Sequence, residues 1–196
     1  MDALACEFNR PETVRWLTGI PQTFSGEACR RWLLRMESRV AAGAAKSLAF
    51  EENGHALAGG ISLDLRTAEI GFWIRHDLRG LGVGTQMVNS FIDEHLAEFP
   101  FRFIVASVAL ENVVSERLLV RCGFEHAGNL PYRFPNDASA TMAGIFRRAT
   151  GSVIRDVRGV QCLSANLEMV TEAVVKNLSV AAKSELPLGA QSTNNL

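Results

Sequence analysis

The sequence has few of the residues that form disulfide frameworks or metal sites, and it has no long apolar run. Its four cysteines, at positions 6, 29, 122 and 162, form no Cys-x-x-Cys pair, and its four histidines are not clustered. This argues against a disulfide framework and against a metal site, and it fits a reducing cytoplasm. The N-terminus has no segment of the signal-peptide kind, and no apolar run approaches membrane-spanning length. We therefore expect a cytoplasmic protein with no membrane partner.

Charge of either sign is not in excess. The 196 residues contain 20 Lys and Arg against 21 Asp and Glu, a formal net charge of −1. Bulk electrostatics therefore indicates no nucleic-acid partner. An apolar fraction of 47% is ordinary for a soluble globular protein, and the length suits one domain with a sizeable core.

Glycine is concentrated where an expected strand meets an expected helix. The apolar, partly β-branched run at 68–75 predicts a buried strand. The apolar residues after the glycines recur with the helical period: Met87, Val88, Phe91, Ile92 and Leu96. Between the two runs, Gly80, Gly82 and Gly84 let the backbone turn tightly and approach a ligand closely. A loop of this kind at the start of a helix directs several N–H groups to one point, which predicts an anion site, usually for phosphate.

Two common phosphate loops do not fit this segment. A Walker loop ends in Gly-Lys-Ser/Thr, but Thr85 follows Gly84 with no lysine between them. A dinucleotide fingerprint needs a small residue three positions after Gly82, where this chain has threonine. The pattern that does match is Arg/Gln-x-x-Gly-x-Gly/Ala, beginning at Arg79. Taken alone, the hexapeptide is equally consistent with a tight turn that binds nothing.

A second pattern follows at a suitable distance. An alternating strand at 101–108 leads into Asn-x-x-Ser at 112–115, a short helical run, and then Gly-Phe at 123–124. Together the two patterns resemble the coenzyme A segments of the GNAT N-acetyltransferase superfamily, over residues 25–147. Residues 69–74 and 123–128 are similar to the RimJ/RimL branch, the ribosomal-protein N-terminal acetyltransferases and their relatives.

The resemblance implies a function and a set of binding residues. It implies acetyl-CoA as co-substrate, no metal, direct transfer with no acylated residue, and an amine acceptor that is a protein N-terminus or a small molecule. Loop amides would hold the pyrophosphate, Arg79 would add charge at its edge, and the backbone at 72–74 would run beside the pantetheine arm. The expected coenzyme A residues are Phe72, Trp73, Ile74, Arg79, Gly80, Leu81, Gly82, Val83, Gly84, Thr85, Asn112 and Ser115.

Transfer of an acetyl group to an amine needs a base for the ammonium proton and an acid for the departing thiolate. We expect Glu69, at the start of the central strand, to be the base, and a solvated strand-end charge is its alternative. Many superfamily members carry a tyrosine as the acid where this chain has Leu119. Ser115 matches the branch motif and is the candidate acid. The alternative is that it is a serine in the first turn of a helix with no catalytic role. Asn112 would contact the pantetheine, although helix capping alone would also explain it.

Two aromatic residues are candidates for the acceptor site. The resemblance places Trp32, on an apolar helical stripe that starts after Ser25, and Tyr132, the single tyrosine, near the acceptor. A packing role is the alternative for both. Of the histidines, His76 lies next to the glycine loop.

The order of elements predicts an α/β (α+β) GNAT fold, a mixed, mostly antiparallel twisted sheet with helices on both faces. Residues 1–8 indicate a short strand, shorter than the branch usually has. Asn9 indicates a helix cap. The Asn-Gly pair at 53–54 indicates a hairpin between strands at 46–50 and 56–65. Gly-Gly at 59–60 indicates a bulge or a close backbone approach, and 124–129 and 141–147 are the closing strands.

We assign residues 1–148 to the acetyltransferase domain and 149–196 to a C-terminal extension. A helical apolar stripe at about 163–182 predicts an amphipathic helix, which either packs on its own domain or forms a homodimer contact. Residues 187–196 are polar and predict a disordered tail. The missing tyrosine, the short front end and this extension keep open an inactive module that binds acyl-CoA. A nucleotide-binding protein with the same loop is a third alternative.

Overall fold

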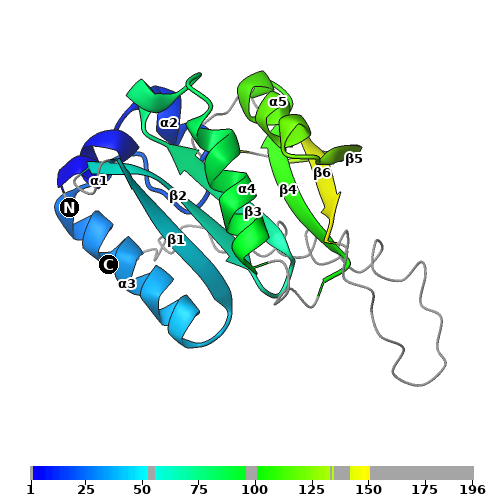
Figure 1. Cartoon of the computed structure of the whole chain (residues 1–196). Helices are drawn as coiled ribbons and strands as arrows, with labels where there is room; N and C mark the ends of the chain where they lie inside the picture. The colour runs from blue at the N-terminus through cyan, green and yellow to red at the C-terminus, as the bar shows by residue number, and fades with distance from the viewer. Residues whose placement is uncertain (1, 53–55, 96–100, 133, 135–141, 151–196) are drawn as a thin grey trace, which may run out of the picture. The chain divides into compact units, whose positions relative to one another are not determined.

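The computed structural model describes residues 2–52, 56–95, 101–132, 134 and 142–150 (Figure 1). In chain order, the elements found there are α1 (Asp2–Phe8), α2 (Pro11–Val14), α3 (Gly26–Ala41), β1 (Ala45–Glu52), β2 (Ala56–Asp64), β3 (Glu69–Ile74), the 3₁₀ helix η1 (His76–Leu78), α4 (Val83–His95), β4 (Phe103–Ala109), α5 (Val113–Arg121), β5 (Glu125–Pro131) and β6 (Met142–Ala149).

The six strands form one mixed sheet in the order β1-β2-β3-β4-β6-β5. Every neighbouring pair is antiparallel except β3 and β4, which are parallel. These two strands are joined at a single register pair, Glu69 opposite Val105, whereas β2 and β3 are paired over six positions. The predicted α/β class with a mostly antiparallel sheet is confirmed.

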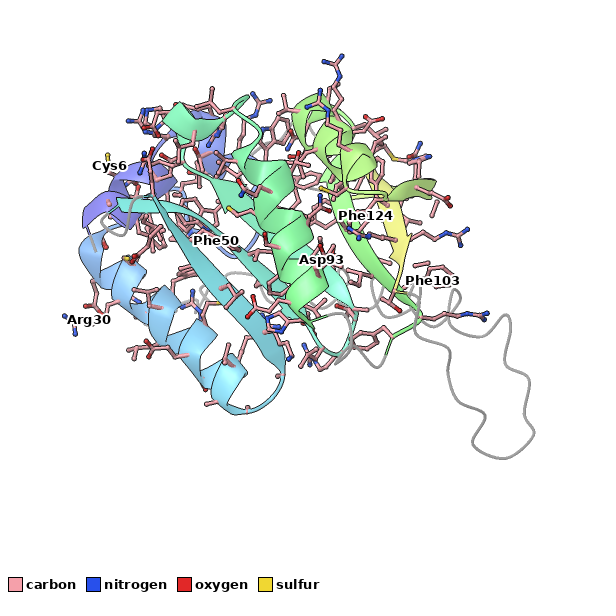
Figure 2. All side chains as sticks on the ribbon, in the orientation of Figure 1. Cys6, Arg30, Phe50, Asp93, Phe103 and Phe124 are labelled. Atoms are coloured by element: carbon pink, nitrogen blue, oxygen red, sulfur yellow. The ribbon has the colours of Figure 1, made fainter. Side chains whose placement is uncertain are left out.

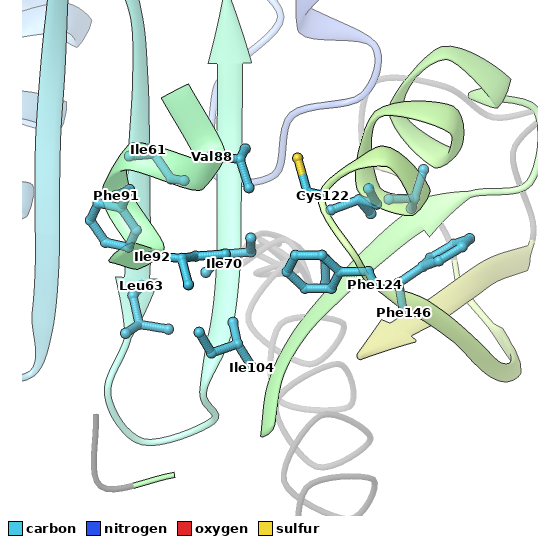
Figure 3. Packing of buried hydrophobic residues seen from close by; sticks show 13 residues of the cluster. Ile61, Leu63, Ile70, Val88, Phe91, Ile92, Ile104, Cys122, Phe124 and Phe146 are labelled. Carbon is cyan, nitrogen blue, oxygen red and sulfur yellow. The ribbon is translucent and has the colours of Figure 1, made fainter. Parts of the chain in front are cut away.

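Helices α4 and α5 cover one face of this sheet (Figure 1). The apolar stripe predicted for the helix after the glycine loop is buried there, with Val88, Phe91 and Ile92 fully enclosed. They pack with Ile61, Ile70 and Ile104 from the strands and with Phe124 and Phe146 (Figure 3). Burial of this cluster fixes α4, and therefore the loop before it, against the middle of the sheet.

A second apolar cluster joins α1 and α3 to residues Leu57 and Trp73 of the sheet. Phe8 is at its centre: its ring centroid is 5.0 Å from that of Trp73, 5.1 Å from that of Phe24 and 5.6 Å from that of Trp32. The tilted and edge-on ring geometries are the preferred arrangements of aromatic pairs. This cluster ties the N-terminal helices to the strand that precedes the glycine loop.

The N-terminal segment differs from its prediction. Residues 2–8 form helix α1, not a strand, because Ala3, Leu4 and Ala5 favour a helix and the helix buries Leu4 and Phe8. Asn9 does not cap α2, whose N-cap position is Arg10. Instead, the Asn9 side chain accepts from Phe24 N at 2.8 Å and donates to Phe24 O at 2.9 Å, so it joins the chain before α3 to the end of α1.

Other local predictions are confirmed. Ser25 caps α3, with its hydroxyl accepting from Ala28 N at 3.2 Å. Strands β1 and β2 form the predicted antiparallel pair, with a register shift between Phe50, which is opposite Gly59, and Glu51, which is opposite Leu57. A Cβ atom at Gly59 would lie 2.6 Å from Trp73 O, and one at Gly60 would lie 2.7 Å from Trp73 Nε1. The two glycines therefore serve a close approach of β2 to Trp73.

Strand β6 is tied to both helices of the α4 and α5 face. The Arg148 guanidinium donates to Asn89 Oδ1 at 2.9 Å and to Cys122 O at 2.8 Å. Its Nη2 atom is 3.8 Å from the carboxylate of Asp93, which is labelled on α4 in Figure 2.

The last described residue is Thr150, so the predicted helix at 163–182 and the tail lie outside the described residues. Within the part of the chain that is described, none of the helices has the length and apolar character needed to cross a membrane.

Candidate active site

The glycine loop joins η1 to α4. Gly80 and Gly82 have φ values of +78° and +84°, a left-handed conformation that other residues rarely adopt. A Cβ atom at either position would meet nothing within 4 Å, so backbone conformation requires these glycines and steric space does not. The first backbone bond of this helical segment runs from Gln86 N to Gly82 O. The amides of Val83, Gly84 and Thr85 therefore lie in the first turn, where an α-helix offers N–H groups to a ligand.

Gly84 is required for a different reason. A Cβ atom there would lie 2.2 Å from Ile74 Cδ1 and 2.5 Å from Leu118 Cδ1. The start of α4 is thus packed tightly between the end of β3 and α5. In contrast, Leu81 at the tip of the loop is 70% exposed. The loop has a rigid base and an open, solvent-facing tip, which suits a backbone site for a phosphate group.

Arg79 is not directed toward the loop amides by its contacts. Its Nη2 atom donates to Glu7 Oε1 at 3.0 Å and to the hydroxyl of Thr13, and its Nε atom donates to Ile74 O at 3.1 Å. Its Nη1 atom also lies 3.4 Å from Glu12 O. The contacts give Arg79 a role that the sequence motif did not indicate, which is to join the loop to α1 and α2.

Glu7 is the centre of this connection. It is almost fully buried, and its carboxylate also accepts from the Thr13 hydroxyl at 2.6 Å and lies 3.0 Å from His76 Nδ1. His76 therefore contacts the N-terminal helix and belongs to the same cluster as Arg79. Sequence reasoning missed Glu7, because an acidic residue in a short N-terminal helix carries no pattern that identifies a partner about seventy positions away.

Strands β3 and β4 separate immediately after their one pair of residues. They are paired at Glu69 and Val105, and the remainder of β3 is paired with β2 alone. At residues 72–74, the edge of β3 that faces away from β2 is therefore not paired with β4. The side chain of Phe72 packs against the main core and that of Trp73 against Phe8, so these residues offer only backbone groups at this edge.

The Asn-x-x-Ser motif forms the start of α5. Asn112 is its N-cap, and its side-chain oxygen accepts from Ser115 N at 3.2 Å. The predicted capping role of Asn112 is therefore present. Ser115 is half-buried in the first turn of the helix, which leaves its hydroxyl at the helix end that attracts negative charge.

Glu69 lies at the point where β3 and β4 separate. Ser107 on β4 favours the ionised form of the Glu69 carboxyl group and so acts to lower its pKa. Burial raises the pKa of Glu69 above its ordinary value, and the nearby carboxylate of Asp64 acts in the same direction. Glu69 is thus not a fully solvated strand-end charge, and a raised pKa makes it a stronger base.

Tyr132 is close enough to Glu69 to be affected by its charge. Burial, and to a lesser extent the Glu69 carboxylate, raise the pKa of Tyr132 to about 12. Its ring packs against Phe134 with centroids 4.3 Å apart, and Phe134 in turn contacts Trp16. Glu69 is therefore within electrostatic reach of both Tyr132 and Ser107.

Trp32 belongs to a different group. It is half-buried on α3 and packs against the rings of Phe8 and Phe24, at 5.6 and 6.4 Å between centroids. Packing explains these contacts. Among the residues that the structure describes, no group of three His, Cys, Asp or Glu side chains is arranged to hold a metal ion.

A family model describes this combination of fold and loop. The acetyltransferase (GNAT) domain model matches residues 1–125, which is more than half of the chain. The protein therefore belongs to the GNAT family of acetyltransferases, and its enzyme class is N-acetyltransferase. No curated protein matches the chain by sequence.

Solved structures show the same fold at low identity. The ribosomal-protein-S5-alanine acetyltransferase from Vibrio fischeri is 20% identical, with a TM-score of 0.65 over 76% of this chain and 87% of that chain. The microcin C7 self-immunity acetyltransferase MccE, in complex with acetyl-CoA and AMP, is 18% identical, with a TM-score of 0.63 over 76% and 86%. The spermidine N-acetyltransferase from Vibrio cholerae, in complex with CoA and spermine, is 16% identical, with a TM-score of 0.63 over 75% and 88%.

Proposed function

We propose that this protein transfers an acetyl group from acetyl-CoA directly to a primary amine, as a RimJ/RimL-like member of the GNAT family. The observation that carries the proposal is the glycine loop, with left-handed Gly80 and Gly82 immediately before the first turn of α4. Backbone amides that converge at a helix start recognise phosphate without a side-chain cation. This matters here because the contacts of Arg79 commit it to Glu7 and Thr13.

The residues present suit coenzyme A. The amides of 83–85 would bind its pyrophosphate, and the free β3 edge at 72–74 would bind the amides of the pantetheine arm in the manner of an added strand. The half-buried Ser115, at the start of α5, would lie on the opposite side of that arm. Acetyl-CoA, once bound, supplies the acetyl thioester.

In the proposed reaction, Glu69 accepts a proton from the ammonium form of the acceptor, and the neutral amine attacks the acetyl carbon. The bond between that carbon and sulfur breaks, and Ser115 donates a proton to the departing thiolate. The nitrogen, which is positively charged after the attack, loses its second proton to Ser115, so that the amide forms and the serine hydroxyl is restored. A base with a pKa raised toward neutrality is well matched to an ammonium proton. The acceptor is a protein N-terminus or a small-molecule amine, since structural neighbours are named as enzymes for a protein N-terminus and for spermidine.

Calorimetric titration with acetyl-CoA tests the binding step, with ATP and NAD as controls. We expect micromolar binding of acetyl-CoA alone and its loss in Gly82→Glu. Gly43→Glu is a matched control, because Gly43 also has a positive φ, +65°, and also has open space around it, but it follows α3. Absence of acetyl-CoA binding to the parent protein, or stronger binding of ATP or NAD, would reject the proposal.

Turnover on a panel of amines separates the enzyme from an inactive module that binds acyl-CoA. We expect Glu69→Gln and Ser115→Ala to bind acetyl-CoA as the parent does and to lose turnover. A parent protein that binds acetyl-CoA and acetylates nothing on a broad panel would instead favour the module.

We further propose that residues 1–148 form the acetyltransferase domain and that the predicted helix at 163–182 forms a homodimer contact. Light scattering of the chain cut before Ser152 tests this. The solution mass should halve while the domain stays folded, and a monomer mass before and after the cut would reject the dimer.

A further inference from the structure

Gly71 is an exposed residue in the middle of the sheet. It is the third residue of β3, and the other five residues of this strand are buried or partly buried. Among the residues of β2, β3 and β4 whose burial the structure describes, no other is exposed. Its neighbours Ile70 and Phe72 pack in the cluster beneath α4, where Figure 3 shows Ile70. Side chains alternate along a strand, so Gly71 is exposed on the face opposite α4, which also carries Glu69 and Trp73.

Neither the backbone nor the packing of the described residues requires a glycine at this position. Gly71 does not have the left-handed conformation of Gly80 and Gly82. Strands β2 and β3 keep one register over all six pairs, so Gly71 forms no bulge. Among the described residues, the atom nearest to a Cβ placed there is Ser62 Oγ, at 4.0 Å. Glycine inside a strand weakens it and marks a bulge, a bend or the close approach of a ligand or another chain. The approach of a ligand is the cause that fits Gly71.

The open space over Gly71 lies between Glu69 and Trp73. Residues two apart on one strand face are about 7 Å apart, so the proposed base is the next side chain along this face. The Trp73 indole lies over β2, because its Nε1 atom would be 2.7 Å from a Cβ at Gly60, and its ring packs against Phe8. It therefore leaves the space over Gly71 open. The strand edge proposed for the pantetheine arm begins at the next residue, so this space adjoins both the base and the arm.

We infer that Gly71 is a specificity-determining residue, whose missing side chain leaves the space through which the acceptor amine reaches the thioester. The inference rests on the proposed function, because it assigns Gly71 to the acceptor of that reaction. The carbon chain that bears the amine crosses β3 over the backbone of Gly71, and its nitrogen lies beside Glu69. A side chain at position 71 would occupy this space without touching the glycine loop, so it should hinder the acceptor and spare the coenzyme.

The first experiment measures acetyl-CoA binding to Gly71→Ala and Gly71→Val by calorimetric titration. Both variants should fold, because the added Cβ meets open space in an extended strand, and urea unfolding checks this. We expect dissociation constants within about twofold of that of the parent. A loss of acetyl-CoA affinity in step with the size of the new side chain would assign Gly71 to the coenzyme site and overturn the inference.

The second experiment measures kcat and KM for the best amine of the panel. We expect KM to rise about tenfold in Gly71→Ala, and kcat/KM to fall about a hundredfold in Gly71→Val. Gly26→Ala and Gly26→Val are matched controls, because Gly26 is also exposed, has no left-handed backbone and has no atom within 4 Å of a Cβ, but begins α3. The controls should keep the KM of the parent. An unchanged amine KM in both Gly71 variants would overturn the inference, and Gly71→Ala alone decides if Gly71→Val does not fold.

A comparison of two amines distinguishes a filled space from a merely structural change. The two are substrates of the parent that differ in bulk at the carbon that bears the nitrogen. We expect Gly71→Ala to lose more kcat/KM for the bulkier amine, because the added methyl group and that bulk compete for one space. An equal loss for both amines would overturn the inference.

These measurements separate failure of the inference from failure of the proposed function. If the parent binds acetyl-CoA and acetylates no amine, the proposed function fails and the inference fails with it. If the parent is active and Gly71→Val keeps the parent's KM for the amine, the proposed function stands and only the role of Gly71 is rejected.

Discussion

Arg79 Nη2 and Glu7 Oε1 lie 3.0 Å apart, although seventy-two positions separate the two residues in the sequence. Glu7 is almost fully buried, and its carboxylate also contacts Thr13 and His76. The connection joins the first helix of the chain to the residue that begins the glycine loop. The conformation of the loop therefore depends on an acidic side chain that does not belong to it.

Replacement of Glu7 by Gln should destabilise the protein and weaken acetyl-CoA binding. The glutamine keeps the size of the side chain but removes the charge that offsets Arg79, so we expect a loss of about 1–3 kcal/mol in the free energy of unfolding. Urea unfolding and calorimetric titration measure the two effects. Glu12→Gln, an exposed neighbour paired with Arg10 at 3.7 Å, should stay within about 0.5 kcal/mol of the parent. Equal urea midpoints for Glu7→Gln and the parent would contradict the prediction.

Alanine at Gly82 and at Gly84 should act through different causes. At Gly82 the added methyl group meets open space, but the left-handed backbone costs about 1 kcal/mol for a residue with a side chain. At Gly84 the methyl group meets Ile74 and Leu118, and overpacking costs about 1–3 kcal/mol. Urea unfolding should show the larger loss for Gly84→Ala. Substituting Ile74 by Val in the Gly84→Ala background should recover part of that loss and none of the loss of Gly82→Ala.

Replacement of Asn112 separates helix capping from ligand binding. Asn112→Ala removes the cap of α5 and should cost about 1 kcal/mol in the free energy of unfolding, whereas Asn112→Ser keeps a capping oxygen and should cost little. If Asn112 also contacts the pantetheine arm, both variants should bind acetyl-CoA more weakly than the parent. Normal affinity in Asn112→Ser would assign the residue to capping alone.

The raised pKa of Glu69 predicts a change in how stability depends on pH. The folded state holds the Glu69 proton more tightly than the unfolded state, so ionisation of this group favours unfolding as pH rises above the ordinary carboxyl range. Glu69→Gln should therefore gain stability relative to the parent as pH increases from about 4 to about 8. Urea unfolding across this range tests it, with Glu51→Gln, an exposed strand glutamate, as control. A difference between Glu69→Gln and the parent that is constant with pH would contradict the prediction.

Features with local causes were predictable from the sequence. Alternating glycines predicted the loop, the 3.6-residue period predicted the buried face of α4, and Ser25 and Asn112 were identified as helix caps. Each depends on interactions within a few residues, so the sequence pattern carries the cause. The Gly-Gly pair of β2 was recognisable for the same reason, although its neighbour, Trp73, was not.

Features that depend on distant partners were not predictable. Asn9 is of a residue type that often caps a helix, but its side-chain amide forms hydrogen bonds with the backbone of Phe24, fifteen positions away. Arg79 matches a phosphate motif, yet it is bound by Glu7 and Thr13.

The single register pair between β3 and β4 also has a consequence for cooperativity. On one side of it, β1, β2 and β3 come from a contiguous stretch, 45–74, and on the other, β4, β6 and β5 come from 103–149. Each half-sheet is a local unit, and such units open separately in native-state hydrogen exchange. We expect the amides of the two halves to exchange with different opening free energies in the free protein. Acetyl-CoA bound as proposed, along the edge of β3 and beside α5, should make them open as one.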